Sequence, residues 1–261
     1  MLDKMKPLPL IVILLLFGCA AQGPASGGPA DKKGPVLISI QPLNGSKNIS
    51  PNQNFTLIFD ELLDPVSIPA SIIIEPDLDY KLKIRGRKLI ISPDKKWQTN
   101  EIVRINLSRK IKDYQKNMMA EPIHLIFSRG SEIPHGIIKG KIIGQDLKKL
   151  IEVGLYEWPP STQSTYIQKV EADETGSFQL TGIENGRYTI IALEGVISDI
   201  GKQIRKKNYA MLTSSYITIS SEENKNNVKM LLSEPLEKLQ ITSVEMQSQY
   251  CSQLTLNNNS K

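Results

Sequence analysis

Residues that could carry chemistry are few in this 261-residue sequence, which has only two histidines. His124 lies between Ile123 and Leu125 in an alternating stretch, which predicts a strand with His124 on its solvent-facing side. His135 falls in a short link rich in proline and glycine. No histidine or cysteine lies at the spacing that zinc ligands need, and no Gly-x-Ser-x-Gly motif marks a nucleophile. We therefore expect no catalytic residue, no cofactor and no metal.

The densest acidic cluster consists of Asp60, Glu61 and Asp64. Carboxylate oxygens can bind calcium, but this spacing matches no calcium loop, and acids are common in the turns at strand ends. A carboxylate pair for glycoside hydrolysis would also need a substrate cleft. We therefore interpret the cluster as the polar end of a strand.

The strongest basic run is formed by Lys202, Arg205, Lys206 and Lys207. It follows a predicted strand over 188–193 and should lie in a loop. A solvated loop is the simpler interpretation, and contact with the phosphate groups of an anionic lipid or envelope polymer is the functional one. The net charge of +5 is modest and evenly spread, which argues against a nucleic-acid partner.

The first of the two cysteines, Cys19, stands at the end of an apolar run. Residues 8–18 are almost purely aliphatic, and Lys4 and Lys6 precede them. A basic segment before a short apolar core is typical of a secretory signal, and the run is about half of the roughly 20 residues that a spanning helix needs. If Cys19 is modified, Cys251 has no disulfide partner in the chain.

The sequence Leu-Phe-Gly-Cys at 16–19 resembles the lipobox of bacterial lipoproteins. This resemblance implies that residues 1–18 are a signal peptide and that Cys19 carries palmitate-type lipid, which anchors the protein in a membrane. Ala20 stands where an aspartate would favour the inner membrane in that family, so the resemblance implies the outer membrane, with the domains facing either the periplasm or the exterior. Cleavage by ordinary signal peptidase near residues 20–21 is the alternative.

Residues 35–130 consist of short runs that alternate between apolar and polar positions, as in 80–85 and 103–108. About seven such runs, separated by clusters of Asn, Gly, Pro and Asp, predict an antiparallel β-sandwich with one solvent-facing side to each sheet. Residues 19–34 are rich in Gly, Pro, Ala and Ser, which predicts a flexible tether.

Three short motifs occur in order at 35–36, 42–45 and 59–61: Pro-Val, Pro-Leu-Asn-Gly and Phe-Asp-Glu. They resemble the opening of the bacterial Ig-like domain of cell-envelope lipoproteins, which implies an Ig-like sandwich. The late Asp-x-x-Gly-Asn turn of that family appears at 113–117, with Lys116 in place of glycine. We expect a positive φ at Asn117 there, or a different type of turn.

Residues 135–233 contain Asp-x-x-Gly-x-Phe at 173–178, followed by Gly-Ile-x-x-Gly-x-Tyr at 182–188. These motifs resemble the carboxypeptidase-regulatory-like, prealbumin-like β-sandwich, although Ile183 stands where leucine is common. Gly176 should form a hairpin turn, and Phe178 and Leu180 should face one core. Residues 228–232 should supply a closing strand. The tail, 234–261, should hold at most an edge strand over 239–244 and then disordered polar residues.

The sequence therefore predicts an all-β protein with two tandem β-sandwiches, Ig-like and then prealbumin-like, behind a lipoprotein signal and a flexible tether. Such modules imply a fold and not an activity. We expect a non-catalytic, lipid-anchored cell-envelope protein that binds the membrane through Cys19 and presents both modules to a protein or glycan partner. The alternative is an accessory subunit of an envelope enzyme, or an atypical hydrolase.

Overall fold

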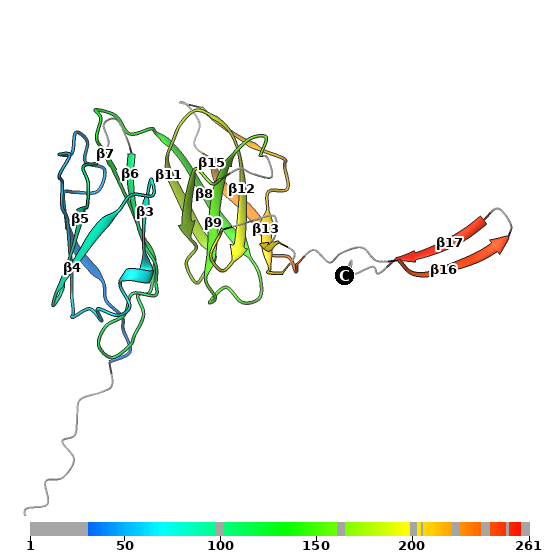
Figure 1. The fold of residues 1–261 in the computed structure, drawn as a ribbon, viewed down its shortest axis with the longest axis horizontal. Coiled ribbons are helices and arrows are strands. Elements are labelled where there is room, and N and C mark those ends of the chain that lie inside the picture. Colours follow the sequence, from blue (N-terminus) through cyan, green and yellow to red (C-terminus); the bar gives the residue numbers. More distant parts are fainter. Residues whose placement is uncertain are drawn as a thin grey trace, which may run out of the picture. The chain divides into compact units, whose positions relative to one another are not determined.

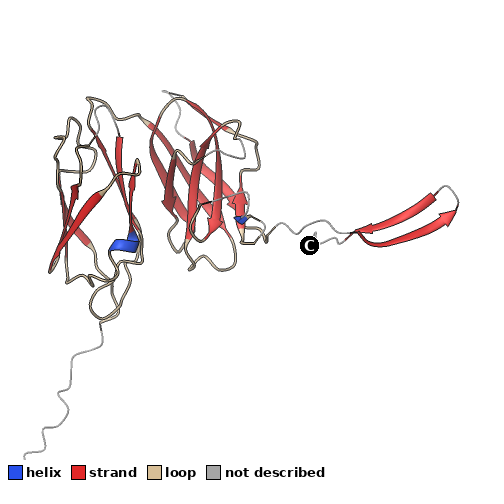
Figure 2. Cartoon of the chain, in the orientation of Figure 1, coloured by secondary structure: helices blue, strands red, loops and turns tan. Residues whose placement is uncertain are grey.

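The structure is a computed structural model that describes residues 31–97, 102–160, 165–198, 203–204, 206–220, 225–235, 241–248 and 251–256. The described chain is all-β, as predicted, with strands joined by loops and a short 3-10 turn, η2 (Pro69–Ser71) (Figures 1 and 2). Both sandwiches belong to one compact unit, residues 33–261. Cys19 and the predicted signal peptide lie outside the described residues. Within the part that is described, no helix combines the length and apolarity that a bilayer crossing requires.

The first sandwich is built from two antiparallel sheets with a shared core. One sheet has the strand order β1 (Leu37–Gln41), β2 (Phe55–Phe59), β5 (Lys88–Pro93), β4 (Tyr80–Arg85), and the other has the order β3 (Ile72–Glu75), β6 (Ile102–Leu107), β7 (Ile123–Ser128). Alternation buries one side of each strand, as Phe55 and Leu57 show in β2. The Phe55 ring packs 4.4 Å from the Phe127 ring and 5.7 Å from the Trp97 ring, centroid to centroid, and so joins the two sheets.

The second sandwich has the same layered plan with its own core. One sheet has the order β10 (Gln168–Glu171), β9 (Ile151–Glu157), β12 (Gly186–Glu194), β13 (Tyr209–Met211), and β14 (Ile217–Ile219) also pairs with β12. The other has the order β11 (Ser177–Ile183), β8 (Gly136–Ile143), β15 (Lys225–Leu231). Phe178 and Leu180 lie in this core beside Tyr188 and Ile190, as the alternation predicts.

Two predicted turns differ from expectation. Gly176 has a φ of 82° as a turn requires, but the turn carries the chain from β10 to β11 in the opposite sheet, so the expected hairpin is absent at this point of the described chain. In the 113–117 turn the positive φ, 71°, falls on Lys116 and not on Asn117. Asp113 fixes Asn117 by accepting hydrogen bonds from its backbone N–H and its side-chain Nδ2, each at 2.8 Å.

The closing strand of the second sandwich, β15, pairs in parallel with β8. Met230 enters the core beside Ile142, while the flanking positions of β15 face outward. The strand predicted over 228–232 is thus present, and the sequence pattern gave no indication that its pairing would be parallel.

The tail also departs from the expected edge strand and disordered end. β16 (Ile241–Ser248) pairs antiparallel with β17 (Cys251–Leu256) in a two-stranded sheet of its own. The register sets Val244 opposite Leu254 and Ile241 opposite Leu256. Apolar cross-strand positions of this kind favour a hairpin, which the abundance of polar residues in the tail obscured.

We predict that ending the chain after Pro235 leaves the melting temperature of the sandwiches close to that of the full chain, whereas ending it after residue 224 lowers it by several degrees. The second truncation removes Met230 from the core, and burial of such a side chain contributes about 1.5–3 kcal/mol. Thermal melts followed by circular dichroism will measure both. Equal melting temperatures for the two truncations would contradict the role given to β15.

Candidate functional site

The edge strand β10 packs against the outer face of the β3-β6-β7 sheet, and all four of its residues are buried. Glu75 Oε1 accepts a hydrogen bond from the Lys169 backbone N–H at 3.0 Å. Asn106 Nδ2 donates to the Lys169 carbonyl oxygen at 3.0 Å, and His124 Nε2 lies 3.3 Å from the Glu171 carbonyl oxygen. Side chains of the first sandwich thus occupy the place of a neighbouring strand along β10, which would otherwise be an open edge.

His124 lies on the outer face of its sheet, as predicted, but it is half-buried and not freely exposed to solvent. Alternation does direct its side chain away from the core of the first sandwich, but the second sandwich covers it. Burial lowers the pKa of His124 to about 4, which keeps the ring neutral near pH 7. Its two nitrogens face acceptor oxygens of Asn106 and Glu171. A neutral ring can donate to only one of them, whereas a protonated ring could donate to both. The hydrogen bond to the Glu171 carbonyl oxygen therefore raises the pKa and opposes the lowering that burial causes.

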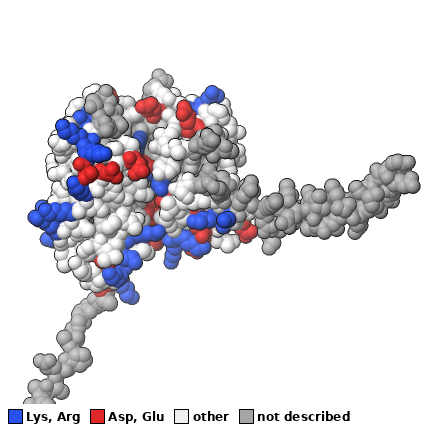
Figure 3. Space-filling model, viewed as in Figure 1, with Lys and Arg blue, Asp and Glu red and all other residues white. Residues whose placement is uncertain are grey.

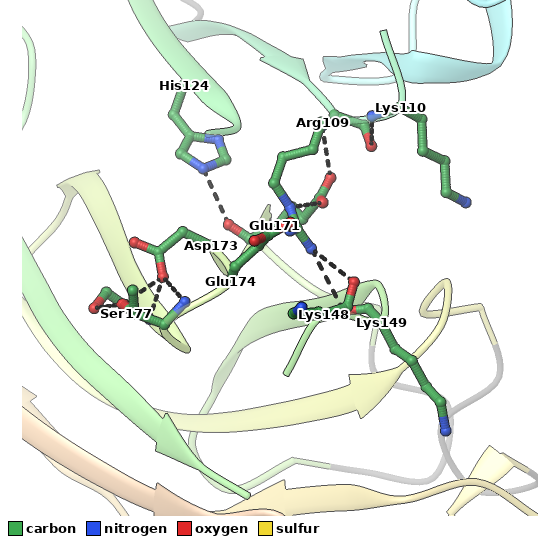
Figure 4. Close-up of polar contacts among 11 residues, drawn as sticks. Arg109, Lys110, His124, Lys148, Lys149, Glu171, Asp173, Glu174 and Ser177 are labelled. Atoms are coloured by element: carbon green, nitrogen blue, oxygen red, sulfur yellow. Dashed lines mark hydrogen bonds and ion pairs between the residues drawn. The ribbon is translucent and has the colours of Figure 1, made fainter. Parts of the chain in front are cut away.

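Arg109 forms the centre of the polar contacts between the sandwiches (Figure 4). Its Nε donates to Glu171 Oε1 at 2.8 Å and its backbone N–H donates to Glu171 Oε2 at 3.3 Å. Nη1 lies 3.1 Å from Glu174 Oε1, and Nη2 donates to the carbonyl oxygens of Lys148 and Lys149. Arg109 is only 5% exposed, so these are charge-assisted bonds shielded from water.

A second buried ion pair lies beside the first. Lys169 Nζ donates to Glu152 Oε2 at 2.9 Å, and the same oxygen accepts the Ile197 N–H at 2.7 Å. The Lys169 ammonium also lies 5.2 Å from the centre of the Tyr166 ring. Nearby, burial raises the pKa of Glu75 to about 7, although the Lys169 N–H bond and the charge of Arg104 act in the opposite direction.

Several hollows border this junction in the described part of the chain. A groove of about 730 Å³ runs between β7 and the outer face of the β11-β8-β15 sheet, and His124 forms part of its wall. A smaller hollow of about 240 Å³ lies on the other side of His124, next to Asn106 and Lys169. A third, of about 500 Å³, is lined by lysines at 110, 149, 206 and 207 together with Glu194.

The predicted basic contact is described only in part. Lys206 and Lys207 are exposed at the third hollow, and Lys202 and Arg205 lie outside the described residues. The fold brings Lys206 and Lys207 near Lys110 of the first sandwich, which no sequence pattern indicated. Contact of this region with an anionic surface stays a prediction.

The remaining candidate residues take part in local contacts. Asp60 Oδ1 accepts the Val36 N–H at 2.7 Å, and Asp64 pairs with Lys116 at 2.6 Å, which lowers the pKa of Asp64. His135 is exposed just before β8. A carboxylate oxygen of Glu61 lies within 4.8 Å of carboxylate oxygens of Asp31 and Asp113, and the interpretation of the acidic cluster as the polar end of a strand stays a prediction.

Sequence reasoning did not indicate the junction residues Asn106, Arg109 and Glu171. Asn106 occupies a strand position that alternation assigns to solvent, and Arg109 follows that strand in a loop. One sequence signal was available, namely the polar strand Gln-Lys-Val-Glu at 168–171, which has no apolar face of its own. The structure buries all four of its residues.

A family model matches the part of the chain that forms the first sandwich. Residues 31–128 match the family model of the bacterial Ig-like domain, a range that includes β1 to β7. Comparison with curated proteins gave no match.

Three solved structures illustrate the remote similarities of the chain. The N-terminal part of the bacterial S-layer protein SbsC is 15% identical over 60% of this chain and 40% of that chain, with a TM-score of 0.28. An L,D-transpeptidase from Mycobacterium smegmatis is 12% identical over 76% of this chain and 89% of that chain, with a TM-score of 0.28. BcpA, the major pilin subunit of Bacillus cereus, is 13% identical over 77% of this chain and 70% of that chain, with a TM-score of 0.26. At these values the similarities carry no argument about function.

We predict that Arg109→Met destabilises the protein by about 3 kcal/mol, because it leaves the Glu171 carboxylate buried without its charged partner. Adding Glu171→Met should recover much of the loss. The control is Lys47→Met, which removes the pair with Glu132 at 3.0 Å, where the two side chains are 39% and 75% exposed; such pairs contribute about 0–1 kcal/mol. Urea unfolding will measure all three. Equal effects of Arg109→Met and Lys47→Met would contradict this account.

We predict that Glu75→Gln raises the free energy of unfolding more at pH 8 than at pH 4. The pKa of folded Glu75 is raised from 4.5 to about 7, so the wild type loses stability as the pH rises between these values, while the amide does not. The gain at pH 8 should be on the order of 2 kcal/mol. His124 acts in the opposite sense, because its lowered pKa removes stability as the pH falls from 6.5 to about 4.

The effect of His124 is common to the wild type and the Glu75→Gln variant and therefore cancels in their difference. Urea unfolding at a series of pH values will give that difference directly. A difference independent of pH would show that Glu75 does not titrate in this range.

Proposed function

We propose that the protein is a non-catalytic, lipid-anchored binding or scaffold protein of the bacterial cell envelope, which presents two coupled β-sandwiches to a protein or glycan partner. The closure of the β10 edge by side chains of the first sandwich carries this proposal. It makes the two modules one unit with a shared surface, and the hollows of about 730 Å³ and 500 Å³ both lie along their junction.

The bonding of the junction residues supports binding over catalysis. Arg109 and Glu171 engage each other, and Lys169 engages Glu152. His124 faces Asn106 and a backbone carbonyl oxygen. A general acid or base needs to reach a substrate, whereas Arg109, Glu171 and His124 are engaged with partners across the junction and Lys169 is engaged with Glu152 inside the second sandwich.

Two observations support this location. The sequence at 16–19 resembles a lipobox, with Ala20 after the cysteine, which favours an outer-membrane lipoprotein. The match of residues 31–128 to the bacterial Ig-like domain supports an envelope or extracellular protein. Membrane attachment through acyl chains on Cys19 would place the sandwiches next to the lipid surface, with residues 20–34 as the connecting segment.

We predict that Cys19→Ala abolishes lipid labelling and leaves the uncut precursor, because the thiol is the acceptor of the lipid. Metabolic labelling with an alkyne fatty acid, followed by gel analysis, will measure both effects. Cys251→Ala is the matched control and should keep the label and the size of the mature protein. A labelled Cys19→Ala variant would contradict the lipid anchor.

A further inference from the structure

The groove of about 730 Å³ between β7 and the β11-β8-β15 sheet contains three lysines on one sheet face. Lys139 and Lys141 project from β8, and the register sets Lys229 of β15 beside Lys141. All three are exposed, and across the described chain none has a carboxylate partner. Like charges on neighbouring strands are destabilising. A ligand that carries negative charge would relieve the repulsion between these lysines.

The acidic residues of the same groove offset this charge only in part. Glu171 is neutralised by Arg109. Asp173 keeps its negative charge, but its Oδ1 already accepts three hydrogen bonds within its own turn, from the Thr175 N–H and hydroxyl and from the Ser177 N–H, at 2.7–2.9 Å. Glu121 is the remaining carboxylate of the lining. Three lysines against two free carboxylates leave one net positive charge, and the lysines gather it on one sheet face of a concave groove.

The rest of the lining is suited to polar chains with many hydroxyl groups. Asn44, Gln179, Thr181 and Asn227 border the groove, and their amide and hydroxyl groups both donate and accept hydrogen bonds. Phe178 also belongs to the lining but is only 5% exposed. Pro122, Ile126 and Val228 are half-buried in the same lining, and such apolar surface can contact the ring faces of sugar residues.

We propose that this groove binds a linear acidic glycan whose carboxylate or phosphate groups pair with Lys139, Lys141 and Lys229. The inference rests on the proposed binding function and names the glycan as the partner class. A flat bilayer cannot enter a groove between two sandwiches, whereas an extended polymer chain can follow it. Because charge pairing between exposed groups dominates, the affinity should fall as the salt concentration rises.

The test is calorimetric titration of the full-length protein with three polymers: polygalacturonate, phosphorylated dextran and neutral dextran. We predict that one or both acidic polymers bind and that dextran does not, and the comparison shows whether carboxylate or phosphate is preferred. The variant Lys139→Gln/Lys141→Gln/Lys229→Gln should lose at least tenfold in affinity.

The matched control removes the same charge from another sheet face. Lys83→Gln/Arg85→Gln/Lys88→Gln alters β4 and β5, whose exposed basic residues face away from the junction; Figure 3 shows basic side chains on the margin where these strands lie. This control should stay within twofold of the wild type. All six side chains are exposed, so unchanged thermal melts will verify the fold of both variants.

Several outcomes would overturn the proposal. Equal losses in the two triple variants would show general attraction to a basic protein, and equal binding of dextran would exclude a charge-based site. If neither acidic polymer binds while vesicles with anionic lipids do, the groove is not a glycan site. None of these results tests the lipid anchor, because that part of the proposed function is tested by Cys19 labelling alone.

Discussion

The structure depends on how the open edge of β10 is closed. A strand at the edge of a sheet exposes N–H and C=O groups that invite pairing with other chains. Here Glu75, Asn106 and His124 supply those bonds from the first sandwich. The covering of one edge thereby fixes how the two sandwiches lie against each other, and every groove at the junction follows from that placement.

The buried charges act on orientation more than on total stability. Removing two ions from water opposes most of the gain from pairing them, so the Arg109–Glu171 and Lys169–Glu152 pairs contribute little net free energy. A different docking of β10 on the first sandwich would, however, leave Arg109 or Glu171 buried and alone, which is strongly unfavourable. Lys169 and Glu152 both belong to the second sandwich and would stay paired. The Arg109–Glu171 pair therefore selects one arrangement from the many that an apolar contact would allow.

Much of the fold was predictable because its signals are local. Period-two alternation placed Phe55, Phe178 and Leu180 in their cores, and the all-β class followed. The junction was not predictable, since Asn106 and His124 occupy positions that are solvent-facing within their own sheet. The sequence pattern around a polar residue at such a position is identical whether water or a second domain covers that residue. The parallel pairing of β15 and the grouping of lysines around the grooves depend on topology, which alternation does not encode.

The parallel pair of β8 and β15 has a consequence for the order in which the protein matures. β8 is the first strand of its sandwich in the chain and β15 is the last, so that sheet completes only when the final strand has emerged. Pairing between such distant segments is slow. The face that closes β10, by contrast, belongs entirely to residues that precede it in the chain. During synthesis or export, the residues of the first sandwich that cover β10 thus emerge before β10 itself, so the first sandwich can fold before that strand needs to be covered.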